Sequence, residues 1–347
     1  MVTAIYGGVY WDGTPAFVEK EASEQVLNEQ LATTKPNEDS KEFPEEIGQL
    51  VFLRHLKISC VNYHVELESI PASICKLPYL ETIHVEGSIA ECLPNEIWMM
   101  RQLRHLQVNG VDGGIKLPRP PSKGDHTLSK LQVLSGVEVD VETAILFRKS
   151  LFPNLRKLYI LKHPHYADCD DDKSIQASTE MLASLESLQC LEILKFGRFY
   201  FGQLSDSFPS SSKLTRITFD SCNFLDLNRL MESLGKLANL RILKIKSCGM
   251  LSSHLYFRAG DFPQVEVLKM IDIYPLGWWE LETHALPNLQ HLVIDGCGYL
   301  RNLPDELWSL ANLRMVEVLG NTPEYLKKKL NMTKQSKRRT DTIANSS

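Results

Sequence analysis

Residues 237–245 read Leu237-Ala238-Asn239-Leu240-Arg241-Ile242-Leu243-Lys244-Ile245. Their apolar pattern, Leu-x-x-Leu-x-x-Leu-x-Ile, returns about eleven times along the 347 residues. The second apolar position of each copy serves as a marker, and the markers are Leu53, Leu80, Leu103, Leu131, Leu155, Leu191, Leu214, Leu240, Val265, Leu289 and Leu313. Most markers lie 23 to 28 residues apart. A period of this length is typical of proteins built from stacked structural repeats.

Each copy predicts a short strand followed by a helical or irregular return. In 243–245 the apolar residues Leu243 and Ile245 alternate with Lys244, so the apolar pair faces one side of the strand. Ordering a repeat costs roughly 1–2 kcal/mol per residue in backbone entropy, whereas each buried aliphatic side chain returns only roughly 1.5–3 kcal/mol. One repeat is therefore unstable alone, and stacking must supply the remainder. We expect an α/β leucine-rich-repeat solenoid of about eleven irregular repeats, with a parallel sheet on its concave side.

The repeat frame also predicts the domain organisation. It covers residues 43–325 as one solenoid, preceded by an acidic, weakly structured segment at 1–42 and followed by a basic, disordered tail at 326–347. The interval from Leu155 to Leu191 is 36 residues long, because a polar insertion occupies 163–172. We expect this insertion to be a loop on the rim of the solenoid.

Two near-identical elements mark the return segments. Leu-Pro-Asn-Glu-Ile-Trp at 93–98 reappears as Leu-Pro-Asp-Glu-Leu-Trp at 303–308. A proline is harmless in the first turn of a helix, so each element predicts a short return helix with Trp98 or Trp308 in the core. Residues 113–121 contain Gly113-Gly114 and three prolines, which predict an irregular return instead.

The cysteines and histidines predict structural roles. None of the eight cysteines forms a C-x-x-C pair or has histidines at zinc spacing. Cys222, Cys248 and Cys297 each follow the last apolar strand residue by three positions, where a buried thiol can donate to the turn backbone. His163, His165 and the aspartates at 168–172 lack the spacing of a calcium loop, so we expect neither a metal nor another cofactor.

Composition excludes several classes of function. The net charge of −5 argues against a general nucleic-acid binder. The sequence contains no run of 18 apolar residues, so we expect no membrane span. The N-terminus lacks the basic and apolar regions of a signal peptide, which favours a cytoplasmic protein, with nuclear import through the basic tail as an alternative. The one Gly-Lys pair, Gly235-Lys236, has Leu230 and Leu237 where a phosphate-binding loop needs glycine and Ser or Thr. We expect no enzymatic activity.

The outward strand positions are the candidate partner-binding surface. Repeats five to nine place six basic side chains there, against Asp220 alone of opposite sign. His55, His105 and His291 also share an outward slot, but they belong to repeats one, three and ten, and we expect them to lie well apart. The predicted contact residues are Lys57, His84, Gln107, Lys157, Tyr159, Lys195, Arg216, Thr218, Lys244, Lys246 and Lys269.

Several of these segments carry a family resemblance. Leu-Ser-Lys-Leu-Gln-Val-Leu-Ser-Gly at 128–136, and Leu-Pro-Asn-Leu-Gln-His-Leu-Val-Ile at 286–294 running into Cys297, are the most telling. From 43 to about 325 the chain resembles the leucine-rich-repeat region of plant intracellular NLR disease-resistance proteins of the coiled-coil class, in the group of late-blight resistance proteins. The resemblance implies protein recognition in plant immunity. The implied partners are a pathogen effector, a guarded host protein, or the receptor's nucleotide-binding domain, which the repeats would hold in an autoinhibited state.

The resemblance does not extend to a whole receptor. Such receptors carry a signalling domain and a nucleotide-binding switch before the repeats, and this chain shows neither, so nucleotide binding does not carry over. A fragment, a truncated product and a stand-alone repeat scaffold all remain open. A substrate-recruiting subunit of a ubiquitin ligase is a further alternative. It would need an F-box-like helical domain upstream of residue 43, where Val26, Leu27 and Leu31 are the only apolar trio.

Overall fold

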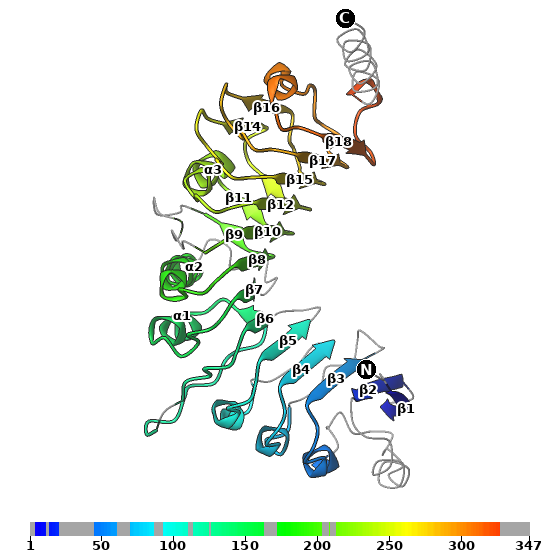
Figure 1. The fold of residues 1–347 in the computed structure, drawn as a ribbon, viewed down its shortest axis with the longest axis vertical. Helices are drawn as coiled ribbons and strands as arrows, with labels where there is room; N and C mark the ends of the chain where they lie inside the picture. Colours follow the sequence, from blue (N-terminus) through cyan, green and yellow to red (C-terminus); the bar gives the residue numbers. More distant parts are fainter. Residues whose placement is uncertain are drawn as a thin grey trace, which may run out of the picture. The chain divides into compact units, whose positions relative to one another are not determined.

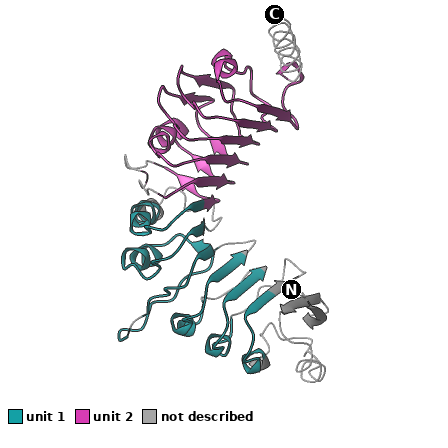
Figure 2. Ribbon diagram, viewed as in Figure 1, with its two compact units in different colours: residues 1–194 teal, residues 195–347 magenta. Residues whose placement is uncertain are grey.

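The chain folds into two compact units. The computed structural model describes residues 4–11, 14–20, 45–60, 70–86, 93–109, 114–124, 126–162, 172–202, 208 and 213–326. Unit 1 comprises residues 1–194 and unit 2 comprises residues 195–347 (Figure 2). The boundary between the units falls inside the strand at Ile193–Gly197.

Eleven strands follow the repeat frame, and each begins two residues after its marker. The parallel order in unit 1 is β3-β4-β5-β6-β7 and in unit 2 β10-β12-β15-β17-β18, while β8 contains the boundary (Figure 1). The predicted frame is therefore confirmed strand by strand. The strands are β3 (His55–Cys60), β4 (Thr82–Glu86), β5 (His105–Asn109), β6 (Val133–Glu138), β7 (Lys157–Leu161), β8 (Ile193–Gly197), β10 (Arg216–Asp220), β12 (Ile242–Lys246), β15 (Val267–Ile271), β17 (His291–Asp295) and β18 (Met315–Leu319).

The leucine frame forms the core. Leu243 pairs in register with Leu268, which pairs with Leu292, and all three side chains are fully buried. The first ten markers are buried as well, and only Leu313, in the last repeat, is half-buried. The intervening residues of β12, including Lys244, remain half-buried or exposed. Side chains of successive repeats thus cover one another, as the stacking argument requires.

The two Leu-Pro elements and the segments that precede the first two repeat strands β3 and β4 form 3₁₀ helices. They are η1 (Glu45–Gln49), η2 (Ile74–Lys76), η3 (Asn95–Met99) and η5 (Asp305–Ser309). Pro94 and Pro304 directly precede η3 and η5, as predicted. Trp98 is buried, and its indole N–H donates to the carbonyl oxygen of Pro118 at 3.1 Å. Trp308 is only half-buried, so it contributes less to the core than predicted.

Longer return segments form α-helices or irregular structure. The helices are α1 (Val141–Arg148), α2 (Asp172–Ser184) with the 3₁₀ turn η4 (Leu185–Ser187), and α3 (Leu227–Gly235). Asp140 caps α1 by accepting from the Thr143 backbone N–H at 2.6 Å. The described residues between 114 and 132 contain no helix, which confirms the predicted irregular return there. Residues 163–171 of the polar insertion lie outside the described residues. α2 begins at Asp172, the last residue of the insertion.

Unit 2 carries additional short strands behind its main strands. β9 (Tyr200–Phe201), β11 (Asn223–Phe224) and β13 (Gly249–Met250) form one small sheet, and β14 (His254–Phe257) and β16 (Trp278–Leu281) form another. Figure 1 shows α3, β14 and β16 on the side away from β12, β15 and β17. Phenylalanines pack next to the sheet of β9, β11 and β13. The ring of Phe201 is stacked on that of Phe224 at a centroid distance of 5.1 Å, and the ring of Phe196 on that of Phe219 at 5.5 Å.

The N-terminal segment contains a hairpin. β1 (Ala4–Trp11) pairs antiparallel with β2 (Thr14–Lys20), and β2 pairs antiparallel with β3. The first repeat strand would otherwise leave a row of unpaired backbone groups, which another strand can bind. Residues 21–42 and the predicted tail lie outside the described residues.

Candidate protein-interaction surface

The predicted contact residues of unit 1 lie in two rows on the side of the sheet turned away from the leucine core, hereafter the sheet face. In the middle row, Lys57 pairs in register with His84, His84 with Gln107, and Tyr159 follows through Ser135. Lys157 belongs to the neighbouring row. Parallel pairing without a register slip across β3 to β5 is what aligns these side chains, because neighbouring strands lie only about 4.8 Å apart.

The sheet face of unit 2 carries the predicted basic residues. Thr218 pairs with Lys244, and Lys244 pairs with Lys269 in the middle row. Arg216 and Lys246 occupy the rows on either side. The structure therefore brings these residues together on three adjacent strands, β10, β12 and β15.

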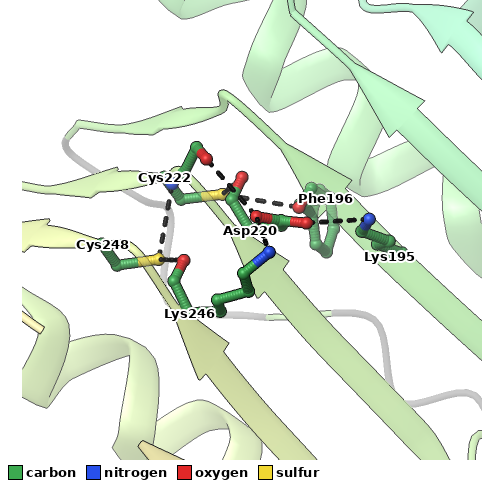
Figure 3. A network of polar contacts seen from close by, with 7 residues as sticks. Lys195, Phe196, Asp220, Cys222, Lys246 and Cys248 are labelled. Carbon is green, nitrogen blue, oxygen red and sulfur yellow. Dashed lines mark hydrogen bonds and ion pairs between the residues drawn. The ribbon is translucent and has the colours of Figure 1, made fainter. Parts of the chain in front are cut away.

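Asp220 compensates part of this positive charge. Lys195 Nζ lies 2.9 Å from Asp220 Oδ2, and Lys246 Nζ lies 3.8 Å from Asp220 Oδ1 (Figure 3). Burial acts to raise the pKa of the Asp220 carboxyl, but the hydrogen bond and charge of Lys195 and the charge of Lys246 outweigh it, so the pKa is lowered. The positive charge of Lys195 and Lys246 is therefore partly neutralised.

Arg216, Lys244 and Lys269 have a different environment. No acidic side chain among the described residues forms an ion pair with any of them. Lys244 and Lys269 are also direct register partners, so two like charges stand opposite each other. Such pairs destabilise a sheet. We define Arg216, Lys244 and Lys269 as the basic patch.

A second charge pattern, missed by the sequence reasoning, lies one residue before the strands. Glu81 forms ion pairs with Arg54 at 3.5 Å and with Arg104 at 3.1 Å, and these link three successive repeats. Arg241 and Glu266 repeat the arrangement in unit 2 at 3.1 Å. The signal was present in the sequence, because the residue after the marker is Arg or Glu in eight of the eleven repeats. These exposed pairs contribute little stability individually, but they show that most neighbouring charges on the sheet are matched.

The histidines are less separated than predicted. His55 and His105 are both register partners of Thr82, and His105 Nδ1 lies 3.1 Å from Thr82 Oγ1. Burial lowers the pKa of His105, and the charge of His55 lowers it further. The expectation that these two lie well apart is therefore wrong, because strands two repeats apart are only about 10 Å from each other. His291 is in unit 2, where its Nε2 lies 2.5 Å from Glu317 Oε1.

The predicted structural role of the three turn cysteines is confirmed. Cys222, Cys248 and Cys297 are buried, and their thiols donate to backbone carbonyls, as Cys248 does to Lys246 at 3.0 Å. The Cys222 backbone N–H also points to Cys248 Sγ at 3.4 Å (Figure 3). Burial raises the pKa of Cys297 to about 11, so this thiol is neutral at physiological pH. The thiols therefore help to close the turns that follow the strands.

Other kinds of site were sought in the described part of the chain. It contains no group of three or more His, Cys, Asp or Glu side chains placed to hold a metal ion. Within the same residues, no helix combines the length and apolar character needed to cross a membrane.

Parallel strands that recur with the leucine frame define a leucine-rich-repeat protein. The family model for the leucine-rich repeat region matches residues 29–339, and the chain belongs to this family. A leucine-rich-repeat protein of Leptospira interrogans aligns over 84% of this chain and 91% of its own, at 15% identity and a TM-score of 0.26. With a score that low, the fold assignment rests on the strands and the family match.

Two sequence relatives come from the plant Solanum demissum. A late blight resistance protein homolog of Solanum demissum is 28% identical over 297 residues, which is 82% of this chain and 21% of the relative. A late blight resistance protein of the same species is 28% identical over 299 residues, with the same coverage of each chain. This chain therefore spans about a fifth of the length of these relatives.

Proposed function

We propose that this chain is a non-catalytic protein-recognition module in plant disease resistance, and that its basic patch binds an acidic protein surface. The relatives named for late blight resistance support the biological setting. The sheet face supports the mode of action, because its strands present regularly spaced polar side chains on a rigid frame. A cytoplasmic location, with the nucleus as an alternative, is part of the proposal.

The observation that carries the proposal is the opposition of Lys244 and Lys269. Elsewhere on the sheet, basic side chains such as Arg241 and Lys195 have an acidic neighbour, whereas these two face each other. The arrangement costs stability in the free protein. An acidic partner surface would offset the repulsion between Lys244 and Lys269. The pair is therefore better explained as part of a binding surface than as a stabilising feature of the free sheet.

The proposed partners are a pathogen effector, a guarded host protein, or a nucleotide-binding domain that the repeats hold in an inactive state. An acidic surface on any of them would be attracted by the basic patch. Charge complementarity of this kind raises the association rate and sets specificity, and salt weakens it. We therefore expect partner binding to fall steeply with ionic strength.

The test reverses the charge of the patch. The variant Arg216→Glu/Lys244→Glu/Lys269→Glu is compared with the control Lys123→Glu/Lys149→Glu/Lys236→Glu, which changes three exposed lysines outside the sheet face. Binding to a co-expressed nucleotide-binding domain, and to partners purified from leaf tissue with the parent chain, is then measured. We expect the patch variant to lose at least tenfold in affinity and the control to stay within twofold. Equal binding by both folded variants would exclude the basic patch as the contact surface.

A further inference from the structure

A cavity of about 540 Å³ lies in unit 2 on the side away from the sheet face. α3, β14, β16 and the first residues of η5 line it, so successive repeats contribute. Its floor is apolar, since Phe257, Trp279, Leu281 and Leu303 are buried. The volume lies within the range of about 300–1,000 Å³ found for ligand sites.

The rim of the cavity is strongly acidic. The lining contains five carboxylates against one basic side chain, Arg258, and the carboxylates are Glu232, Glu280, Glu282, Asp305 and Glu306. Arg258 is already paired with Glu232. Glu280 and Glu306 are exposed, and no basic side chain in the described part of the chain pairs with either. An added cation would therefore meet unsatisfied negative charge.

A neighbouring carboxyl reports the same negative field. Burial raises the pKa of Asp261, and the charges of Glu232 and Glu282 raise it further. The opposing effects are the Arg258 backbone N–H, which donates to Asp261 Oδ2 at 3.1 Å, and the Arg258 charge. Because the pKa is still raised, negative charge outweighs positive charge at this position.

An exposed aromatic row continues from the cavity. Tyr256, which lines it, is stacked with His254 at 6.2 Å, and His254 is stacked with Trp278 at 6.0 Å. The guanidinium of Arg301 lies over the Trp278 ring at 5.0 Å. This surface thus already binds one cation of its own chain by a cation–π contact.

We propose that this cavity binds a lysine or arginine side chain carried by a basic, extended segment of a partner protein. The cation pairs with Glu280 and Glu306, and its aliphatic stem packs on Tyr256. The inference goes beyond the proposed function, because the cavity and the basic patch lie on different sides of unit 2. Either surface can fail its test without affecting the other.

The experiment uses the full chain and a fluorescent peptide of alternating lysine and glycine. Glu280→Gln/Glu306→Gln removes two charges at nearly constant shape, and Glu96→Gln/Glu186→Gln is the matched control outside the cavity. We expect the cavity variant to bind the peptide at least fivefold more weakly than the parent, and the control to change less than twofold. Unchanged thermal melting of both variants confirms that folding is intact.

Two further measurements separate specific binding from general attraction. The same peptide with acetylated lysines should not bind, and the lysine peptide should slow amide exchange in β14 and at residues 302–306. Equal weakening by the cavity and control variants, equal binding of the acetylated peptide, or no binding of the lysine peptide would each overturn the proposal.

Discussion

Individual backbone positions determine how closely the repeats stack, and Gly136 is the clearest case. Its φ is +82°, and β6 shifts register between Ser135 and Val137, so this glycine forms a bulge in the strand. A Cβ atom at this position would lie 1.8 Å from the carbonyl oxygen of Val108 in the preceding repeat. Both the dihedral angle and the close approach therefore require glycine.

The first prediction separates these two requirements. Gly136→Ala is compared with Gly260→Ala, which has a similar φ of +83° but nothing within 4 Å of the added Cβ. The left-handed conformation alone should cost about 1–2 kcal/mol at Gly260. Gly136→Ala should cost clearly more, because the backbone of the neighbouring repeat must also move. Equal losses in the free energy of unfolding, measured with urea, would contradict the close approach.

A second residue-scale prediction concerns Asp220 and pH. Its folded-state pKa is lowered, so it contributes stability above its unfolded pKa and loses that contribution as the pH falls through the folded value. At pH 7, Asp220→Asn should reduce the free energy of unfolding by about 0.5–1 kcal/mol, a modest value because the lysines are partly exposed. The difference between parent and variant should vanish in acid. A difference that stays constant down to pH 3 would show that the ion pairs contribute nothing.

At the scale of the element, one strand covers the next. Leu243 in β12 is flanked in register by Ile217 of β10 and Leu268 of β15, and all three are fully buried. Lys244, the next residue, belongs to the sheet face. A single strand therefore contributes to the core with one set of side chains and to the candidate binding surface with the other.

This geometry predicts the effect of truncating the strand. Leu243→Ala should destabilise unit 2 by about 2–5 kcal/mol, because it leaves a cavity between neighbouring repeats. Amides of β10, β12 and β15 should exchange faster, since coupling in repeat proteins is mainly to nearest neighbours. Lys244→Ala is the control and should change the unfolding free energy by less than about 0.5 kcal/mol. A melting curve of Leu243→Ala identical to that of the parent would contradict the frame assignment.

At the scale of the whole molecule, net charge is a poor guide to binding. The chain carries a net charge of −5, yet the sheet face of unit 2 presents Arg216, Lys244 and Lys269. The other side of the same unit presents an acidic cavity. Opposite charges are thus kept apart by the leucine core. Two partners of opposite charge could therefore be bound without competing directly.

Local periodicity was sufficient to predict the eleven strands of the repeat frame. A leucine such as Leu240 recurs at the same place in each repeat, so the start of β12 at Ile242 follows from counting, and burial of Leu243 follows from alternation. The cysteine turns were predictable for the same reason. Their geometry depends only on the few residues after each strand, and these also repeat.

Contacts between repeats could not be obtained in this way, because they depend on register, return length and side-chain reach. Asp220 meets Lys195 and Lys246 because parallel stacking brings three repeats together at one point. The acidic cavity needs α3, β14, β16 and η5 in one place, although the repeat pattern says little about these returns. Periodicity thus accounts for the frame and the direction of its side chains, whereas stacking in space determined which charges are neutralised and where a cavity forms.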